Sequence, residues 1–302
     1  MAAPNSAFAG AATMSRLAQL SAARLKHDGR RSVKLGYDAS LFSGPAWHPD
    51  WPAMYRDQVS PLSALWVSAG RPHGSTGPRV PDPTRAAAQQ FARDLKKQGV
   101  RVTKIGPAKA SRRATQLAAV SSLPLERIVE HLLMVSDNDA AEVLLRHVAL
   151  AAGRPGSTTE GVRAVRASLA ELGVGTEGAR IVDGSGLARQ NVLPATTLVE
   201  LLRLAASDDH PELRAVVTGL PVAGVEGSLR VRFGDDASLA GRGVVRGKTG
   251  TLREVHSLAG LIRTRDGSVL VFAFLINRPK NAFNARVWLD RVTAAISSCG
   301  CR

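Results

Sequence analysis

The stretch VVRGKTGTL runs from Val244 to Leu252 and carries an isolated lysine. The chain of 302 residues has 40 lysines and arginines, yet between Lys109 and Lys280 the sole lysine is Lys248. An arginine stays charged, whereas a lysine can shift its pKa and give up its proton. A lysine kept among arginines therefore indicates a position where this proton matters. An exposed lysine on a surface strand would look the same in isolation, so the surrounding sequence has to decide.

Three successive strands are predicted near the end of the chain. Residues 244–252, 255–264 and 268–277 each carry the pattern of a strand, and the turn RDG between the last two favours a hairpin. The third strand is nearly all apolar, which predicts a central strand covered on both faces. A helix is expected over about 281–297 and would pack back on this sheet.

The sequence pattern of the first third of the chain predicts a small region of both helices and strands. A helix is expected over Arg16 to Lys26 and a strand over Ser32 to Tyr37. A second helix is expected over Arg85 to Gln98, with Thr84 as its N-cap and Gly99 as its stop. The segment VRVTKIGPAK follows with the period of a strand, and it predicts a strand of a small accessory sheet.

A polar interruption, SDN, lies between two apolar helices. The first helix has apolar residues at helical spacing from Leu125 to Leu133, which predicts one buried stripe, and the second covers about Ala140 to Ala152. The simple interpretation is a helix break with Asp137 or Asn138 as the N-cap of the second helix. The alternative is that Ser136 and Asn138 project into a cleft, where a hydroxyl can relay a proton and an amide can hold a substrate carbonyl.

The KTG triplet also has a functional interpretation, in which its strand lies at the edge of the same kind of cleft. Lys248 would supply a positive field beside a serine, and Thr249 and Thr251 would donate hydrogen bonds to a substrate carboxylate. Gly250 has no side chain and would let a substrate backbone approach closely. SDN and KTG stand in this order about 110 residues apart, and together they carry more weight than either alone.

The sequence resembles the low-molecular-mass class C penicillin-binding proteins, the D-alanyl-D-alanine carboxypeptidase/endopeptidase family of bacterial cell-wall metabolism. SDN and KTG match the second and third elements of the S-x-x-K, S-D-N, K-T-G set of penicillin-recognising serine enzymes. The resemblance extends to SLFSGPAWHPDWP, VDGSGLARQN, LPVAG with EGSL, and RGKTGTL, so that it covers most of the chain from about Ser15.

This resemblance implies an α+β fold, with a transpeptidase/β-lactamase-like domain built from an antiparallel sheet with helices, N-terminally truncated, and an accessory mixed α/β insert. Residues 1–115 would be the remnant of accessory inserted domains, and residues 116–302 the C-terminal part of the transpeptidase-like domain. The implied ligands are peptidoglycan stem peptides ending in D-Ala-D-Ala and β-lactams. The implied chemistry is a serine acyl-enzyme that water hydrolyses, without a cofactor.

By matching position, the resemblance also assigns roles to residues. Ser136, Asn138 and Lys248 take catalytic roles, and the backbone N–H of Thr251 contributes to an oxyanion hole. The substrate-binding positions are Thr249, Gly250 and Thr251. The signature DGSG at 183–186 belongs to the family too, and it is interpreted as a glycine-rich turn that shapes the cleft wall.

No serine of the 302 residues is followed three positions later by a lysine, so the S-x-x-K nucleophile motif is absent. We expect the chain to begin after this motif, through a truncated gene or a misplaced start codon, and the sheet to lack strands. Two function classes follow. The first is a serine-type D-Ala-D-Ala carboxypeptidase of peptidoglycan metabolism that is inactive as the chain stands. The second is a non-catalytic chain that binds peptidoglycan fragments or a partner.

Composition bears on possible partners, metal sites and location. The net charge of +15 suggests a polyanion partner, but the basic residues are spread along the chain and aromatics make up only 4%, which argues against nucleic acid. Cys299 and Cys301 are too few for a zinc site, and the histidines show no ligand spacing, so no metal is expected. No apolar run suits a membrane helix, and the start lacks a signal peptide. The family implies the cell envelope as location; the chain as written would stay cytoplasmic.

Overall fold

The computed structural model of this protein describes residues 10–72 and 78–298. The chain divides into two compact units. Unit 1 comprises residues 1–124, 141–164 and 183–185, and unit 2 comprises residues 125–140, 165–182 and 186–302. Cys299 and Cys301 lie outside the described residues.

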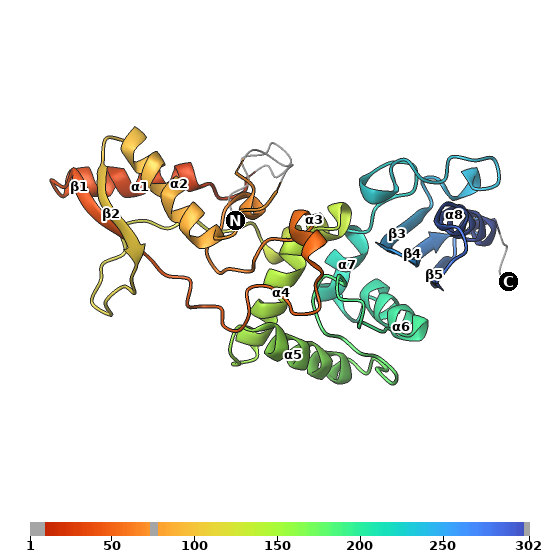
Figure 1. The fold of residues 1–302 in the computed structure, drawn as a ribbon. Helices are drawn as coiled ribbons and strands as arrows, with labels where there is room; N and C mark the ends of the chain where they lie inside the picture. Colours follow the sequence, from red (N-terminus) through yellow and green to blue (C-terminus); the bar gives the residue numbers. More distant parts are fainter. Residues whose placement is uncertain (1–9, 73–77, 299–302) are drawn as a thin grey trace. The chain divides into compact units, whose positions relative to one another are not determined.

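Helices and strands alternate only in the first part of the chain; a run of helices follows, then three successive strands and a last helix (Figure 1). In order, the α-helices and strands are α1 (Met14–His27), β1 (Ser32–Tyr37), α2 (Pro83–Lys97), β2 (Arg101–Pro107), α3 (Leu125–Val135), α4 (Asn138–Ala151), α5 (Thr158–Glu171), α6 (Ala195–Ala206), α7 (Arg214–Thr218), β3 (Val245–Leu252), β4 (Val255–Arg263), β5 (Val269–Asn277) and α8 (Ala282–Ser297). The 3-10 helices are η2 (Ala53–Asp57), η3 (Ser68–Gly70), η4 (Pro211–Leu213), η5 (Gly227–Leu229) and η6 (Leu239–Gly241).

Unit 1 contains a two-stranded parallel sheet, β1 with β2, packed against α1 and α2. The register pairs Val33 with Val102 and shifts at the next residue, so that Thr103 is an extra residue in β2. The predicted helices and strands of this region are confirmed. The N-cap of α2 is Asp82 and not Thr84, because the Asp82 carboxylate accepts the Arg85 N–H and proline suits the first helical turn.

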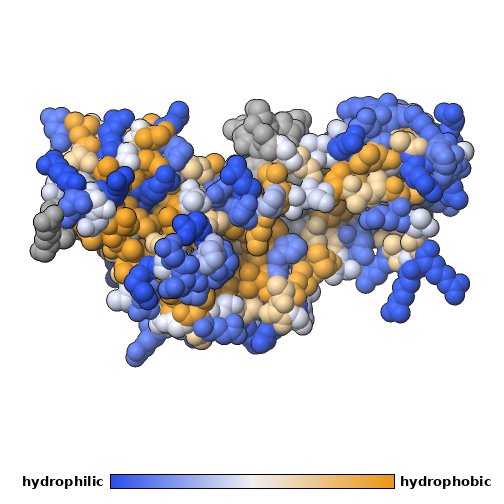
Figure 2. Space-filling view, turned by 180° about the vertical axis from the view of Figure 1, so that it is seen from behind, coloured by the Kyte–Doolittle hydropathy of each residue, from blue (hydrophilic) through white to orange (hydrophobic). Residues whose placement is uncertain are grey.

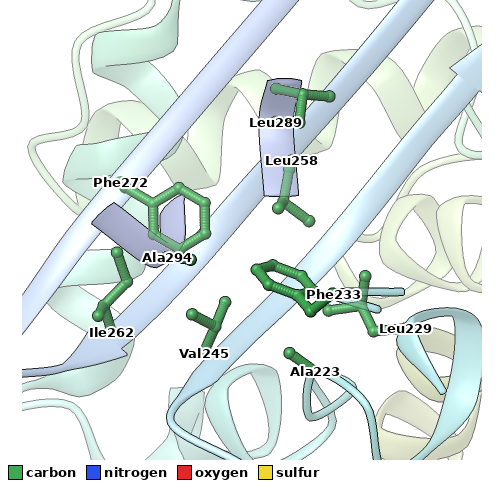
Figure 3. Close-up of a cluster of buried hydrophobic side chains, with 9 residues drawn as sticks. All are labelled: Ala223, Leu229, Phe233, Val245, Leu258, Ile262, Phe272, Leu289 and Ala294. Atoms are coloured by element: carbon green, nitrogen blue, oxygen red, sulfur yellow. The ribbon is translucent and has the colours of Figure 1, made fainter. Parts of the chain in front are cut away.

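Unit 2 contains an antiparallel sheet of order β3-β4-β5. The central strand is β4, whose alternate residues point to opposite faces. On one face Leu258 and Ile262 join Leu289 of α8 in a buried cluster, shown in Figure 3. On the other face Leu261 packs with Leu202 of α6. The sheet is therefore enclosed by α8 and α6, which confirms the predicted antiparallel sheet with helices.

The prediction that the last strand is central is wrong for the described chain. The hairpins add strands one after another, so β5 ends at an edge, and no described strand pairs with its outer side. Its apolar residues are only partly covered: Phe272 is buried, whereas Val269 is 60% exposed. The face seen in Figure 2 likewise shows apolar residues at the surface among hydrophilic ones.

The apolar stripe of α3 differs from its prediction in a similar way. None of the residues of this helix is fully buried. Residues 128–134 are half-buried and the helix contacts α7 and η5, while Leu125 is 62% exposed. Helical periodicity thus identified the stripe correctly but not how much of it is covered.

Candidate active site

Unit 2 brings the SDN and KTG motifs into direct contact. Ser136 lies between α3 and α4, and Lys248 lies on β3, on the side of the sheet that faces α6. The Lys248 ammonium donates a hydrogen bond to the Ser136 hydroxyl oxygen over 2.7 Å. It donates a second one to the backbone carbonyl of Thr249 over 2.8 Å. A side chain 112 positions further along the chain therefore holds the serine hydroxyl.

The local backbone explains how Ser136 is presented. Its φ of 56° lies in the left-handed region, which ends α3 abruptly. The N–H of Asp137 then bonds to the carbonyl of Leu132, and the Asp137 carboxylate accepts the N–H of Ala140 over 3.0 Å. Asp137 is thus the N-cap of α4, one of the two caps predicted. The helix break and the presentation of Ser136 are the same structural feature. Asn138 follows at the first position of α4.

Burial changes the acid–base behaviour of Lys248. Removal from solvent disfavours its charged form and lowers its pKa from 10.5 to about 8. No carboxylate among the described residues forms an ion pair with it, so the loss of hydration is compensated only by neutral oxygens. At neutral pH the side chain is a cation that gives up its proton more readily than an ordinary lysine.

The outer edge of β3 is closed along its first half and open along its second. The N–H of Gly247 bonds to the carbonyl of Pro221, and the carbonyl of Val245 accepts the N–H of Ala223. Because backbone groups alternate sides along a strand, the N–H groups of Thr249 and Thr251 point to this same edge. Beyond Gly247 no described segment pairs with it. The KTG residues therefore offer backbone donors at an open edge.

Thr249 has a partner that the sequence did not predict. Its hydroxyl donates to the hydroxyl oxygen of Ser228 over 3.2 Å. Ser228 lies in η5, directly after Gly227, whose φ is 56° and whose missing side chain would meet the Met134 carbonyl oxygen at 2.5 Å. This close approach packs the EGSL segment against the end of α3, and the same segment also contacts β3. The signal was present in the sequence, since EGSL was part of the family resemblance.

Gly250 has a role inside the sheet. It pairs with Ser257 of β4, and a side chain at position 250 would collide with the Ser257 hydroxyl. A larger residue at position 250 would therefore force the Ser257 side chain to move. Thr251, the next residue, is exposed.

Unit 1 contains a second polar cluster, at the DGSG signature. The carboxylate of Glu142, on α4, accepts the backbone N–H of Gly184 over 2.9 Å and that of Ser185 over 2.7 Å. A side chain at Gly184 would meet the Ala141 carbonyl oxygen at 2.8 Å, so glycine is needed for this close approach. The segment forms a bend, in line with the glycine-rich turn of the sequence interpretation. Glu142 itself was not predicted.

Glu142 has no solvent-exposed surface. Burial, followed by the negative charge of Asp183, raises its pKa from 4.5 to about 7. Asp183 is also buried, and its carboxylate accepts the indole N–H of Trp51 over 2.9 Å. One helical turn beyond Glu142, the buried Arg146 donates to the carbonyls of Ser43 and Pro45. This cluster ties the DGSG bend and the SGPAWHPDW segment to one helix.

Two further properties concern metals and membranes. Within residues 10–72 and 78–298, no three His, Cys, Asp or Glu side chains come together in a way that could hold a metal ion. None of the described helices combines the length and apolar character of a membrane span.

The fold is similar to that of a penicillin-binding protein. The structure is similar to that of penicillin binding protein 4 (dacB) from Haemophilus influenzae, with a TM-score of 0.77 and 22% sequence identity over 95% of this chain and 80% of that chain. A second structure of that protein, complexed with a novel β-lactam, gives a TM-score of 0.67 at 20% identity, over 94% of this chain and 78% of that one. These likenesses confirm the predicted fold class.

The chain belongs to the D-Ala-D-Ala carboxypeptidase 3 (S13) family, whose sequence model matches residues 73–296. It is 36% identical to carboxypeptidase DacB of Mycolicibacterium smegmatis over 299 residues, which are 97% of this chain and 63% of that protein. It is also 36% identical to carboxypeptidase Rv3627c of Mycobacterium tuberculosis, over 92% of this chain and 60% of that protein. The chain therefore spans somewhat less than two thirds of the length of these relatives.

Proposed function

We propose that the Ser136–Lys248 cluster belongs to the site of a serine-type D-Ala-D-Ala carboxypeptidase of peptidoglycan metabolism. Its ligands would be stem peptides ending in D-Ala-D-Ala and β-lactams, because the H. influenzae neighbour was solved with a β-lactam and the relatives are named carboxypeptidases. The observation that carries the proposal is the 2.7 Å hydrogen bond between Lys248 and Ser136, which joins the two motifs of the family.

In this proposal Lys248 and Ser136 act as a proton relay. The ammonium donates to the Ser136 oxygen, so the serine hydroxyl hydrogen is free to point away from Lys248 towards a ligand. In the family reaction a nucleophilic serine bonds to the scissile carbonyl carbon, and the C–N bond then breaks to leave the acyl group on that serine. At this step the Ser136 hydrogen would pass to the departing amine of the terminal D-Ala, and a Lys248 proton would replace it on Ser136. A lysine with a pKa of about 8 suits this transfer, because its proton is only moderately bound at neutral pH.

The remaining residues of the two motifs bind the substrate. Asn138 would donate its amide N–H to a peptide carbonyl, and Thr249 and Thr251 would donate hydroxyl hydrogens to the terminal carboxylate. The backbone N–H of Thr251, at the open edge of β3, would stabilise the oxyanion of the tetrahedral intermediate. Gly250 lies between them and leaves this edge accessible.

The nucleophilic serine of the family motif S-x-x-K is not among the 302 residues. Acyl transfer without a nucleophile loses many orders of magnitude in rate. We therefore expect these residues alone to bind the ligands reversibly and to form no acyl-enzyme. The alternative function, a non-catalytic chain that binds peptidoglycan fragments, rests on this same observation. The place of action would be the cell envelope in both cases, where the family's substrate lies.

Two measurements on the 302-residue chain test the proposal. A fluorescent penicillin should leave no covalent label on a denaturing gel, whereas calorimetry should detect reversible binding. Binding should weaken at least about tenfold in Lys248→Ala and in Ser136→Ala, as for removal of a charge-assisted contact. Lys280→Ala, an exposed lysine outside the motifs, is the matched control. A covalent label would disprove the claim that the chain lacks a nucleophile. Unchanged binding in Lys248→Ala would disprove the assignment of the site.

A further inference from the structure

The two faces of the small sheet in unit 1 differ in character. Val33 and Val102 pack on the buried cluster that α1 and α2 form, so both helices lie on this face. Successive side chains of a strand point to opposite faces. The register therefore puts Lys34 and Lys104, which follows the extra residue of β2, directly opposite each other on the other face. Arg101, the residue before Val102, lies on that face too.

Within the described chain, this second face is open to solvent. Three exposed cationic residues define it, and we call it the basic face: Lys34, Arg101 and Lys104. The second pair beyond the two lysines is Gly36 with Gly106, which alternation puts on the same face. A Cβ atom built at Gly106 would meet no other atom within 4 Å. Ala108 borders the glycine row on the side of Gly36. The basic face thus continues into a row without side chains.

The three cations have no counter-ion among the described residues, where none of their side chains takes part in an ion pair or a hydrogen bond. Asp28, which precedes β1, pairs with Arg24. Asp94, which precedes β2, is buried and pairs with Lys97. Like charges directly opposite each other on neighbouring strands destabilise a sheet. The lysine pair therefore costs stability unless an anion from outside the chain lies over it.

The sequence around the two strands adds charge of the same sign. Arg30 and Arg31 precede β1 and are exposed. No carboxylate occurs between Asp94 and Glu126, and this stretch holds seven cations: Lys96, Lys97, Arg101, Lys104, Lys109, Arg112 and Arg113. Asp38 is the one carboxylate that directly adjoins either strand in sequence. The positive field of the basic face is therefore reinforced by its neighbours along the chain.

The form of this face favours a lipid surface over a nucleic acid. Proteins that bind single-stranded nucleic acid combine cations with aromatic side chains on which bases stack. The one aromatic residue of these strands, Tyr37, shares the covered face with Val33. The headgroups of a bilayer form a continuous charged layer that requires no matching shape, and lysines and arginines close to an anionic bilayer each add to binding. Exposed cations beside a row of glycines suit such a layer.

We propose that the basic face binds unit 1 to the surface of a bilayer that contains anionic phospholipids. The phosphate headgroups lie over Lys34 and Lys104 and beside Arg101, and they supply the counter-ion that the described chain lacks. No side chain enters the hydrocarbon layer, so the attachment is electrostatic and reversible. The proposal uses none of the motif residues and does not depend on the proposed carboxypeptidase function.

Sedimentation with lipid vesicles tests the proposal on the 302-residue chain. The protein should bind vesicles of phosphatidylglycerol mixed with phosphatidylcholine and should not bind phosphatidylcholine alone, and added salt should release it. The triple variant K34Q/R101Q/K104Q should lower the partition coefficient at least about tenfold. K280Q/R166Q/R203Q removes the same net charge from exposed residues of unit 2 and should bind as the wild type does. Equal loss in both variants would overturn the assignment to this face.

Lys104→Glu separates binding from folding. The new carboxylate stands opposite Lys34 and replaces a repulsion by an attraction, so urea denaturation should show equal or higher stability while vesicle binding falls. Loss of both would show that Lys104 serves the fold and would overturn its role in binding. Duplex DNA is the competing ligand. Binding of DNA that the triple variant abolishes, without binding of anionic vesicles, would overturn the lipid surface in favour of nucleic acid.

Discussion

Two polar clusters, one in each unit, each contain a side chain whose pKa is shifted by burial, and the consequences differ. In unit 2, burial lowers the pKa of Lys248 to about 8; in unit 1, burial raises the pKa of Glu142 to about 7. Both groups are moved towards their neutral forms. Lys248 is half-buried and its partners are a hydroxyl and a carbonyl beside an open strand edge, whereas Glu142 is fully buried against backbone N–H groups.

The difference shows where a side chain with a shifted pKa can act on a ligand. The Ser136 partner of Lys248 is exposed, and no described strand pairs with the adjoining edge of β3, so we expect a ligand to contact this cluster without a change of fold. The partners of Glu142 belong to the bend that buries it, so that they cannot be exchanged unless the bend opens. We therefore expect changes at Glu142 to alter stability and changes at Lys248 to alter binding.

Removal of the Glu142 carboxylate should have the largest effect. Glu142→Ala leaves the N–H groups of Gly184 and Ser185 without their acceptor and creates a cavity at a fully buried position, which should lower the free energy of unfolding by about 4 kcal/mol. Glu142→Gln keeps the volume and an acceptor oxygen, so it should cost less than half as much. Urea denaturation measures both, with the exposed Glu171→Ala as control. A loss below about 1 kcal/mol in Glu142→Ala would show that the bend does not need its carboxylate.

The second prediction concerns pH and the same residue. The ordinary pKa of 4.5 is raised to about 7 in the folded state, so the folded state binds more protons between these values. Stability contributed by Glu142 is therefore complete below about pH 4.5 and is lost as the pH rises through about 7. The two pKa values differ by an amount equivalent to about 3 kcal/mol at most.

The measurement is the free energy of unfolding at pH 5 and at pH 8 for the wild type and Glu142→Gln. The wild type should lose more stability than the variant between these two values. Identical pH dependence in both proteins would assign the effect to another group.

The third prediction moves to unit 2. The Lys248 cation should attract the carboxylate of a penicillin, so reversible binding should weaken as the pH rises through about 8 and the ammonium loses its proton. Lys248→Arg keeps its charge and should bind with a flat profile between pH 7 and 10. Calorimetry over this range compares the two, and we expect about a tenfold decline for the wild type. A decline that persists in Lys248→Arg would implicate a different titrating group.

The same contrast explains what could be predicted from the sequence. The bounds of β1 and the existence of strand β3 follow local patterns, and these predictions are confirmed. The position of β5 in the sheet depends on which strand lies beside it, which no local pattern records. Asp82 replaced Thr84 as the cap of α2 because a proline moved the start of the helix by two residues.

The residues of the candidate site show the same contrast between what local patterns predict and what only the fold creates. Ser136 and Lys248 were predicted because each belongs to a motif, and the structure places the two side chains in contact. Glu142 was missed because one glutamate in a helix normally marks the solvent side, and its burial is created by a bend 42 residues further along the chain. Ser228 was quoted within EGSL but received no role, because its contact with Thr249 is visible only when the sheet edge is formed.

The smallest predicted effect tests whether the helix break and the site are one feature. Asp137→Ala removes the cap of α4 and should cost about 1 kcal/mol, whereas Asp137→Asn should be nearly neutral because asparagine caps equally well. The exposed Asp208→Ala is the control in urea denaturation. Because the cap fixes the backbone next to Ser136, Asp137→Ala should also weaken penicillin binding, by less than Ser136→Ala does. Loss of stability with unchanged binding would show that capping α4 and presenting Ser136 are independent roles of SDN.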